Sequence, residues 1–253
     1  MNESGAPPSV SRFDGLAEVY ERYRPGYPPD AIAAILAGLP PQPTVIDIGA
    51  GTGISTRALA EAGAHAIAIE PNDDMRALAI ALGTDARAGT ATATGLADRC
   101  ADAVTAFQAF HWFATAAALH EFRRLLRAPG RVALVWNDRD MRDPFTAALR
   151  DFEARLGEAS MLAAIDFSDD KLEPLLRKAG FGSIHVRTFA NSQRMDEEQF
   201  LGRVRSLSFA PRAGPPFDEM IAELRNLFAR YSGEESRVEL RYRTDVIVAE
   251  RTA

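Results

Sequence analysis

The feature that most constrains this chain is a short apolar run that ends in an acid and three alternating glycines. The segment is VIDIGAGTG, from Val45 to Gly53, and a second acid, Glu70, closes the next apolar run. This pattern predicts a buried strand, a tight glycine turn and a helix, with an acid one strand later. Because α/β folds hold adenosine-containing ligands in this way, the segment indicates a ligand of that kind.

The spacing of the glycines separates two classes of ligand. A dinucleotide fingerprint that begins at Gly49 and Gly51 needs a third glycine at position 54, where the chain has Ile54. The observed spacing is D-x-G-x-G-x-G, and it resembles motif I of class I S-adenosylmethionine-dependent methyltransferases. Adenosylmethionine has no pyrophosphate but carries an ammonium and a sulfonium cation, and an acid such as Asp47 suits both charges. The motif therefore disfavours a nicotinamide-dependent oxidoreductase.

The same motif supplies candidate cofactor contacts. The glycines allow the backbone to pass close under the amino-acid moiety, and Glu70 offers two acceptor oxygens to a ribose diol. Related enzymes often bind the adenine amino group with an acid after the third strand, whereas this chain has the run 89–92, GTAT, so backbone contacts or a Thr hydroxyl remain for adenine. The candidate cofactor-binding residues are Tyr20, Arg24, Asp47, Gly49, Ala50, Gly51, Gly53, Glu70, Pro71, Met75, Ala91, Thr92 and Gln108.

Strands and helices alternate along most of the chain, which predicts a parallel sheet with crossover helices. The seven expected strands are 44–48, 64–70, a short strand before Gly89, 102–107, 131–136, 183–190 and 238–250. The expected helices are 52–62, one that begins at the Pro71-Asn72-Asp73-Asp74 cap and ends near Leu82, 114–126, 143–156 and 169–178.

The alternation breaks between 192 and 236, where two further helical segments are expected near 196–206 and 217–231. Insertions near the carboxyl ends of a parallel sheet usually build the substrate side of a site, although an outer helical layer that only adds stability is the alternative. We therefore expect one methyltransferase domain over 1–253. Its parts are an N-terminal cap (12–40), a cofactor-binding core (43–191), a helical substrate-side insertion (192–236) and a final strand (237–250).

Further segments extend the resemblance over nearly the full length. They are FDGLAEVYERYRPGYPP at 13–29, QAFHWF at 108–113, VALVWNDRD at 132–140 and the terminal VELRYRTDVIVAER. Together they resemble the methyltransferase type 11 group that includes trans-aconitate methyltransferase. The resemblance implies an α/β, Rossmann-like seven-stranded class I methyltransferase sheet with helices on both faces, and S-adenosyl-L-methionine as cofactor. It also implies that the N-terminal cap covers the ligand, with Arg24 either paired with the methionine carboxylate or left as a solvated surface charge.

Two aromatic-flanked residues, His111 and Trp112, are the candidate catalytic residues. They follow the fourth strand, at the sheet edge where the methyl group is expected to point. The ordinary pKa of histidine suits a general base at neutral pH, and Trp112 can pack on the substrate or the sulfonium. The alternatives for His111 are contact with the substrate without proton transfer, and a structural role bonded to a backbone carbonyl.

The acceptor is expected to be a small molecule with an anionic or carbonyl group, held partly by arginines. Oxygen methylation, with a carboxylate as one candidate acceptor group, is the leading hypothesis, with nitrogen methylation and a non-catalytic adenosylmethionine-binding partner protein as alternatives. The acceptor is expected to be a metabolite or an intermediate of secondary metabolism. The candidate substrate-binding residues are Tyr27, His111, Trp112, Asn137, Arg139, Arg203 and Arg205.

Composition excludes several other classes. The net charge is -6 and no basic stripe is present, which argues against nucleic acid as a partner. No uninterrupted apolar run reaches membrane-spanning length, the N-terminus lacks the regions of a signal peptide, and a lone cysteine, Cys100, fits a cytoplasmic location. No pair of the four histidines has metal-ligand spacing with a carboxylate, so no metal site is expected. The sequence leaves the oligomeric state open.

Overall fold

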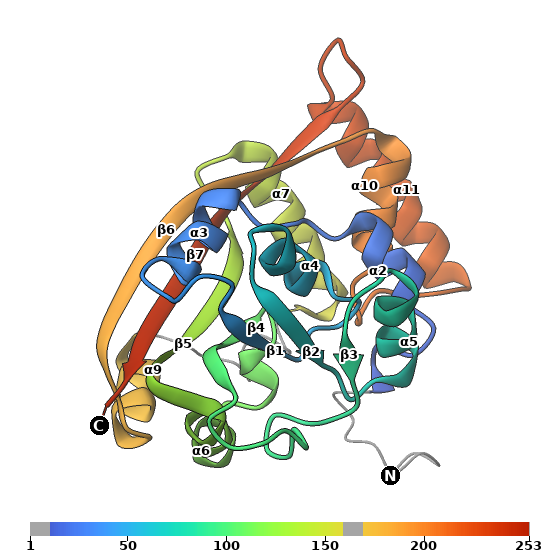
Figure 1. Ribbon diagram of the computed structural model, residues 1–253. Helices are drawn as coiled ribbons and strands as arrows, with labels where there is room; N and C mark the ends of the chain where they lie inside the picture. Colours follow the sequence, from blue (N-terminus) through green and yellow to red (C-terminus); the bar gives the residue numbers. More distant parts are fainter. Residues whose placement is uncertain (1–10, 159–168, 253) are drawn as a thin grey trace.

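The computed structural model describes residues 11–158 and 169–252, and these form a seven-stranded sheet in the order β3-β2-β1-β4-β5-β7-β6 (Figure 1). Strands β1 to β5 pair in parallel, whereas β7 runs antiparallel to both β5 and β6. The bounds are β1 Thr44–Ile48, β2 His65–Ile69, β3 Ala86–Arg87, β4 Ala101–Phe107, β5 Leu126–Arg139, β6 Phe181–Met195 and β7 Val238–Arg251. The predicted seven-stranded α/β sheet is confirmed.

Helices cover both faces of this sheet. The bounds of the helices are α2 Ala17–Tyr23, α3 Pro29–Leu36, α4 Ile54–Glu61, α5 Asp73–Ala81, α6 Ala116–Leu125, α7 Pro144–Glu153, α9 Asp169–Lys178, α10 Glu197–Arg205 and α11 Pro215–Tyr231. Short helical turns span Phe110–Trp112 (η1) and Ala154–Glu158 (η2). Within the described residues no helix combines the length and apolar character that crossing a membrane requires.

The central strands are apolar on both sides because each side meets a helical layer. On β1, Val45 belongs to a buried cluster with residues of α3 and α4, whereas its neighbour Ile46 belongs to another with residues of α6 and α9. Both side chains are completely buried. This two-sided burial explains why β1 appears in the sequence as a continuous apolar run, and it fixes the turn that follows β1 at the carboxyl edge of the sheet.

Side-chain caps set where several helices begin. The side chain of Asn72 accepts a 2.9 Å hydrogen bond from the amide of Met75, and that of Asp143 accepts one of 2.8 Å from the amide of Thr146. Asp196 and Gln199 form a reciprocal capping box at the start of α10. These caps satisfy amides that have no partner inside the helix, so the helix starts lie within two residues of those expected.

Two strands extend well beyond their expected boundaries: β5, expected over 131–136, spans Leu126–Arg139, and β6, expected over 183–190, spans Phe181–Met195. Strand β6 was expected to end at Ala190, but it continues to Met195, which pairs with Val238 at the start of β7. Residues 192–195 therefore belong to the sheet, and the helical insertion occupies the segment between the two strands (Figure 1). The extension has mainly polar side chains because β6 is an edge strand with one exposed face, and such a strand lacks the apolar signal of a buried one.

The insertion is packed on a core of its own beside the main sheet. Phe145 of α7, Phe200 of α10 and Phe228 of α11 lie in one buried cluster together with Leu240 and Tyr242 of β7. The rings of Phe200 and Phe228 stack with their centroids 6.0 Å apart. The two insertion helices therefore pack against the amino-terminal half of β7, over the carboxyl edge of the sheet.

The N-terminal cap joins this insertion to the cofactor-binding core. Helix α2 lies beside α10 (Figure 1), and a Cβ atom on Gly202 would lie 2.4 Å from the ring of Tyr23. The side chain of Gln193 donates a 2.8 Å hydrogen bond to the carbonyl of Tyr23, and Arg57 of α4 forms an ion pair with Glu21. Cap, insertion and core therefore meet along α2.

Candidate active site

The glycine turn between β1 and α4 has the backbone conformation that its sequence predicts. Gly49, Gly51 and Gly53 all have φ values in the left-handed region, at 69°, 58° and 83°. A Cβ atom on Gly49 would lie 2.9 Å from the Cβ of Ala109, and one on Gly53 would lie 2.7 Å from Oγ1 of Thr84. Glycine is needed at 49 and 53 for both conformation and space.

Asp47 lies beneath this turn rather than in a cavity. Its side chain is fully buried, with Oδ2 accepting hydrogen bonds from Ser55 Oγ at 2.6 Å and Thr56 Oγ1 at 2.7 Å, and Oδ1 accepting from Thr105 Oγ1 at 2.9 Å. Burial raises the pKa of Asp47 to about 6, and the three hydroxyl donors act in the opposite direction. Asp47 lines none of the three cavities described below. The geometry gives it the role of an anchor for the turn.

Glu70 follows directly after β2, and its side chain faces the same turn. Its Oε2 accepts a 2.8 Å hydrogen bond from the amide of Gly51, and its Oε1 accepts one of 2.8 Å from the amide of Asn72. Burial raises the pKa of Glu70, while these two backbone donors lower it. Each carboxylate oxygen keeps a second lone pair, so both can also accept from ligand hydroxyls.

A cavity of about 320 Å³ opens beside this turn, at the carboxyl ends of β1 and β2. Phe13 closes one side, with its ring edge-on to Tyr20 at 6.0 Å and to Trp112 at 6.2 Å. The candidate cofactor residues that line the cavity are Tyr20, Gly49, Gly51, Glu70, Pro71, Met75, Ala91, Thr92 and Gln108. Phe13, Phe107 and Phe113 also line it without having been singled out. Phe13 is the first residue of segment 13–29, which carries part of the family resemblance, so this segment could have indicated that Phe13 lines the site.

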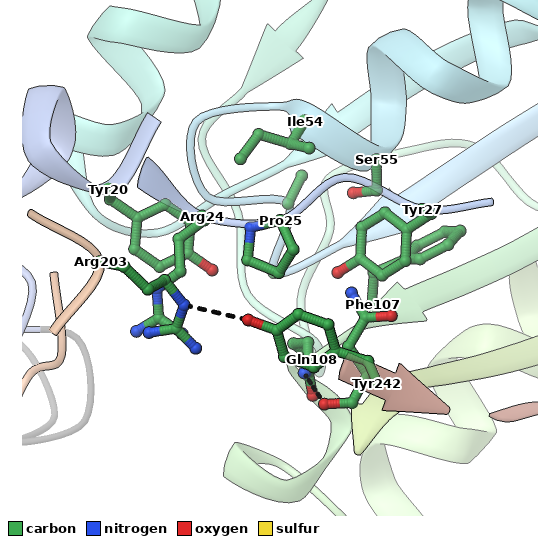
Figure 2. Close-up of a pocket in the computed structure, with 13 residues that line it drawn as sticks. Tyr20, Arg24, Pro25, Tyr27, Ile54, Ser55, Phe107, Gln108, Arg203 and Tyr242 are labelled. Atoms are coloured by element: carbon green, nitrogen blue, oxygen red, sulfur yellow. Dashed lines mark hydrogen bonds between the residues drawn. The ribbon is translucent and has the colours of Figure 1, made fainter. Parts of the chain in front are cut away.

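A second, smaller cavity of about 30 Å³ continues from the turn toward the cap and the insertion (Figure 2). Ala50 of the turn lines it together with Arg24 and Tyr27 of the cap. Tyr27 lines only this small cavity and not the third, larger one at the ends of the strands. Its ring contacts Phe107, with the ring centroids 4.6 Å apart. Gly53 lines none of the three cavities and is the N-cap residue of α4.

Two arginines lie together at one end of this small cavity, where Figure 2 shows Arg24 beside Arg203. Nη2 of Arg24 donates to the carbonyl of Ser206 at 3.1 Å, and Nε of Arg203 donates to the hydroxyl of Tyr242 at 3.3 Å. Burial, reinforced by the nearby charge of Arg203, lowers the pKa of Arg24 to about 10.

Neither of these guanidinium groups is matched by an acid. Nε of Arg24 and Nη1 of Arg203 are buried without a hydrogen-bond partner, and the residue Arg203 is only 4% exposed. In the described part of the chain, no carboxylate lies within ion-pair distance of either group. Two adjacent guanidinium groups, one buried and one half-buried, without a counter-charge among the described residues are unfavourable, so the site is suited to an anion.

The third cavity, of about 730 Å³, lies between the ends of β4, β5 and β7 and the insertion. Five of the candidate substrate residues line it: His111, Trp112, Asn137, Arg139 and Arg203. Arg205 does not, because its side chain is exposed and lies over the ring of Phe217 at 5.8 Å. The two-residue spacing on α10 explains the difference, since positions i and i+2 on a helix face different directions.

The charge of Arg139 is already matched within the protein. Its guanidinium forms an ion pair with Glu153 of α7, whose side chain is fully buried, and it lies over the ring of Tyr242 at 5.7 Å. The side-chain amide of Asn137 also has partners within the protein. Its Nδ2 donates to the carbonyl of Gly26 in the cap at 3.2 Å, and its Oδ1 accepts from the hydroxyl of Thr244 at 2.6 Å. Arg203 therefore differs from Arg139 in having no acidic partner among the residues that the structure describes.

His111 lies in the short turn η1 and lines the large cavity. Burial lowers its pKa to about 4, so the imidazole is neutral at physiological pH. Its Nδ1 accepts a hydrogen bond from the indole Nε1 of Trp136 at 3.4 Å, and its ring lies 4.9 Å from that of Trp112. Trp136 at the end of β5 and Tyr242 on β7 belong to the site but were not predicted, because both occupy ordinary strand positions in the sequence.

The three cavities meet at Tyr20 and Gln108, which line all of them. Gln108 directly follows β4, has a φ of 50°, and donates from Nε2 to the carbonyl of Asn137 at 3.2 Å. This strained position at the sheet edge places one side chain at the common junction. Among the described residues, no group of three His, Cys, Asp or Glu side chains is arranged to hold a metal ion.

The sheet order, the glycine turn after β1 and the acid after β2 define the class I S-adenosylmethionine-dependent methyltransferase fold. Residues 46–134 match the family model described as "Methyltransferase domain". An uncharacterised methyltransferase of Mycobacterium tuberculosis is 41% identical over 148 residues, which cover 58% of this chain and 60% of that protein. A second relative, an uncharacterised methyltransferase-like protein of Schizosaccharomyces pombe, is 32% identical over 168 residues, covering 65% of this chain and 64% of its own length. The matches thus span about three fifths of the length of these relatives.

Solved structures share the fold at low identity. A protein described as a methyltransferase of an antibiotic biosynthesis pathway from Anabaena variabilis has a TM-score of 0.62 and 23% identity, covering 89% of this chain and 98% of that one. Phosphoethanolamine N-methyltransferase 2 of Haemonchus contortus, in complex with S-adenosyl-L-methionine, has a TM-score of 0.60 and 14% identity, covering 98% and 61%. The chain therefore has the class I methyltransferase fold, and residues 46–134 within it are similar to methyltransferase domains. S-adenosyl-L-methionine is the cofactor of enzymes of that class.

Proposed function

We propose that this protein transfers a methyl group from S-adenosyl-L-methionine to a small-molecule acceptor held in the large cavity. The observation that carries the proposal is the meeting of all three cavities at Tyr20 and Gln108. A cofactor that fills the cavity at the glycine turn and the small cavity would present its central atoms at that junction. An acceptor in the large cavity would then reach the same point from the other side.

The residues at the turn suit the polar parts of this cofactor. The second lone pairs of the Glu70 carboxylate are suited to the ribose hydroxyls, and Arg24 is suited to the methionine carboxylate. The segment that includes Thr90, Ala91 and Thr92 lines the far end of the cavity, where adenine would lie. Phe13 and Trp112 would close over the bound molecule and exclude water.

The bound cofactor supplies a methyl carbon that is already activated by its sulfonium. The protein therefore needs mainly to align the acceptor with that carbon and to keep water out. The aromatic wall of Tyr20, Trp112 and Phe13 serves the second purpose, and its π-faces also favour a nearby cation. Gln108 and Asn137 fix the junction, since the first donates to the backbone of the second.

Oxygen methylation of an anionic acceptor, such as a carboxylate, is the leading form of this proposal. Arg24 is half-buried and Arg203 is buried, neither has an acidic partner in the described ranges, and the methionine carboxylate of the cofactor would match only one of them. A second anionic group, carried by the acceptor, would match the other. An amine acceptor would add no negative charge there, so nitrogen methylation is the alternative that the charges support less. A metabolite or an intermediate of secondary metabolism would fit the cavity.

Labelled cofactor tests both the reaction and the atom methylated. The protein is incubated with methyl-labelled adenosylmethionine and a small-metabolite extract, with Glu70→Ala as the matched control. We expect labelled product with the wild type only, and release of labelled methanol from that product in alkali, as for a methyl ester. A label that survives alkali would exclude a methyl ester and would leave methylation of a nitrogen or of a hydroxyl oxygen, which the identity of the product distinguishes. Cofactor binding without any labelled product from several extracts would instead favour a non-catalytic binding protein.

A further inference from the structure

One hydrogen bond in the large cavity determines which ring nitrogen of His111 carries its hydrogen. The indole Nε1 of Trp136 carries a hydrogen and has no lone pair to offer, so it can act only as a donor. It lies 3.4 Å from Nδ1 of His111. In that contact Nδ1 must supply a lone pair, which it can do only when it carries no hydrogen.

The second ring nitrogen follows from the first. A neutral imidazole carries one hydrogen, so an unprotonated Nδ1 places it on Nε2. Among the described residues, Nε2 of His111 has no hydrogen-bond partner, and the side chain lines the large cavity. The ring therefore presents an N–H donor, not a lone pair, to whatever occupies the cavity.

Protonation of the ring is opposed by the same contact. An imidazolium carries hydrogens on both nitrogens, and its Nδ1–H would then face the indole N–H of Trp136. Burial of the ring acts in the same direction and lowers the pKa of His111. The neutral Nε2–H form is thus the one that both the neighbour and the environment favour.

We propose that Trp136 is a positioning residue that fixes His111 as an Nε2–H donor, and that the acceptor therefore enters with a lone pair of an already deprotonated oxygen directed at this donor. The inference rests on the proposed function and deepens it. His111 is then a group that orients the acceptor and not a general base, because the nitrogen that faces the cavity has no free electron pair. An acceptor that is already ionised at neutral pH needs no base there, and a carboxylate meets this condition, whereas an acceptor with a proton to lose would have to use another group of the cavity, such as Asp138 or Asp245.

The methyl transfer balances without a base. One carboxylate oxygen forms the bond to the methyl carbon while the carbon–sulfur bond breaks, and the bonding electron pair goes to sulfur. A carboxylate and a sulfonium become a neutral ester and a neutral thioether, so no proton is released. The other carboxylate oxygen accepts from Nε2 of His111. A neutral alcohol or a protonated amine would have to lose a proton, and His111 in this form offers no site for it.

The tautomer can be measured directly with ¹⁵N-labelled histidine. The chain has four histidines, so two-bond ¹H–¹⁵N spectra of the wild type and His111→Gln assign the signals of His111. We expect the Nε2–H form at about pH 7, with no conversion to imidazolium until the pH falls well below the ordinary pKa of histidine. An Nδ1–H form or an imidazolium at about pH 7 would overturn the proposal.

Trp136→Phe is the matched variant, because it keeps an aromatic ring of similar shape and removes only the N–H donor and part of the indole. Its His111 signals should move toward a mixture of the two tautomers and titrate at a higher pH, with the far-UV circular dichroism spectrum unchanged. Wild-type signals in this variant would show that Trp136 does not fix the ring. These spectra do not depend on turnover, so they fail or succeed separately from the proposed methyl transfer.

The pH dependence of turnover tests the consequence for the acceptor. With the product-forming acceptor from the labelling experiment, kcat of the wild type should stay within about twofold between pH 6 and 8, because no side chain has to take a proton. Trp136→Phe should raise KM more than it lowers kcat. A kcat that rises with pH in the wild type and loses this dependence in His111→Gln would identify His111 as a base and would contradict the inference.

Discussion

Glu70 and Gly51 are joined by a 2.8 Å hydrogen bond from the glycine amide to the carboxylate, which links the end of β2 to the turn after β1. The other carboxylate oxygen binds the amide of Asn72 at the start of α5. One acid therefore holds two loops at the carboxyl edge of the sheet while it lines the cofactor cavity. Its loss is expected to affect both the shape of the turn and the affinity for the ribose.

Asp47 should matter for stability more than for direct contact with the cofactor. Asp47→Ala leaves the hydroxyls of Ser55, Thr56 and Thr105 buried without their acceptor, so we expect the free energy of unfolding to fall by about 2–4 kcal/mol. Urea denaturation measures this loss. Unchanged stability combined with lost cofactor binding would show that Asp47 contacts the ligand instead.

His111 should make the protein less stable as the pH falls. The unfolded chain takes up the proton near the ordinary pKa of 6.5, whereas the folded chain does so only near 4. Between these values the unfolded state binds more protons, so stability is lost as the pH falls from about 7 to 5, by about 1–2 kcal/mol. Denaturation of the wild type and His111→Gln at both pH values isolates this effect. An equal loss in both proteins would assign it to other groups. Asp47 is not among them, because its raised pKa makes the folded state gain stability as the pH falls.

Arg203 and Arg205 form a matched pair on one helix. Arg203→Met should raise KM for the acceptor at least about tenfold, equivalent to about 1.4 kcal/mol, while Arg205→Met should change it by less than about threefold. Because Arg203 is a buried cation without an acidic partner, its replacement should leave the melting temperature unchanged or raise it. Equal KM values in the two variants would argue against an anionic acceptor at this position.

The contact between cap and insertion should influence cofactor binding from a distance. Gly202→Ala places a methyl group within 2.4 Å of the Tyr23 ring, which would push α2 away from α10 and displace the cap that carries Tyr20 and Arg24. We expect a loss of cofactor affinity of at least about tenfold. Gly233→Ala is the control, because a Cβ atom there meets nothing within 4 Å. The same affinity in both variants would show that the cap binds independently of the insertion.

The parts of the fold that local chemistry determines could be predicted from the sequence. The buried strand β1 and the turn with Gly49 follow from apolar runs and glycine spacing, and the start of α5 follows from a cap at Asn72. The extension of β6 to Met195 could not be predicted, since an exposed edge strand has little apolar periodicity. Its pairing with β7 depends on contacts between distant segments.

The candidate site shows the same division. Glu70 and the turn glycines were found because their spacing is local. The difference between Arg139 and Arg203 is not local: Arg139 pairs with an acid 14 residues away, whereas Arg203 has no acidic partner among the described residues. Trp136 could not be recognised as a partner of His111, because 25 residues separate them in the chain and only the pairing of β4 with β5 brings them together. Long-range contacts of this kind leave no signal in residue spacing.

Calorimetric titration with S-adenosylmethionine tests the central claim most directly, because the proposed reaction requires this cofactor at the Glu70 turn. The wild type should bind one equivalent, and Glu70→Ala should lose at least about 1.4 kcal/mol of binding free energy as its hydrogen bonds to the ribose disappear. NADH, used as the competing ligand class, should give no heat of binding. Tight binding of NADH together with no binding of S-adenosylmethionine would contradict the account.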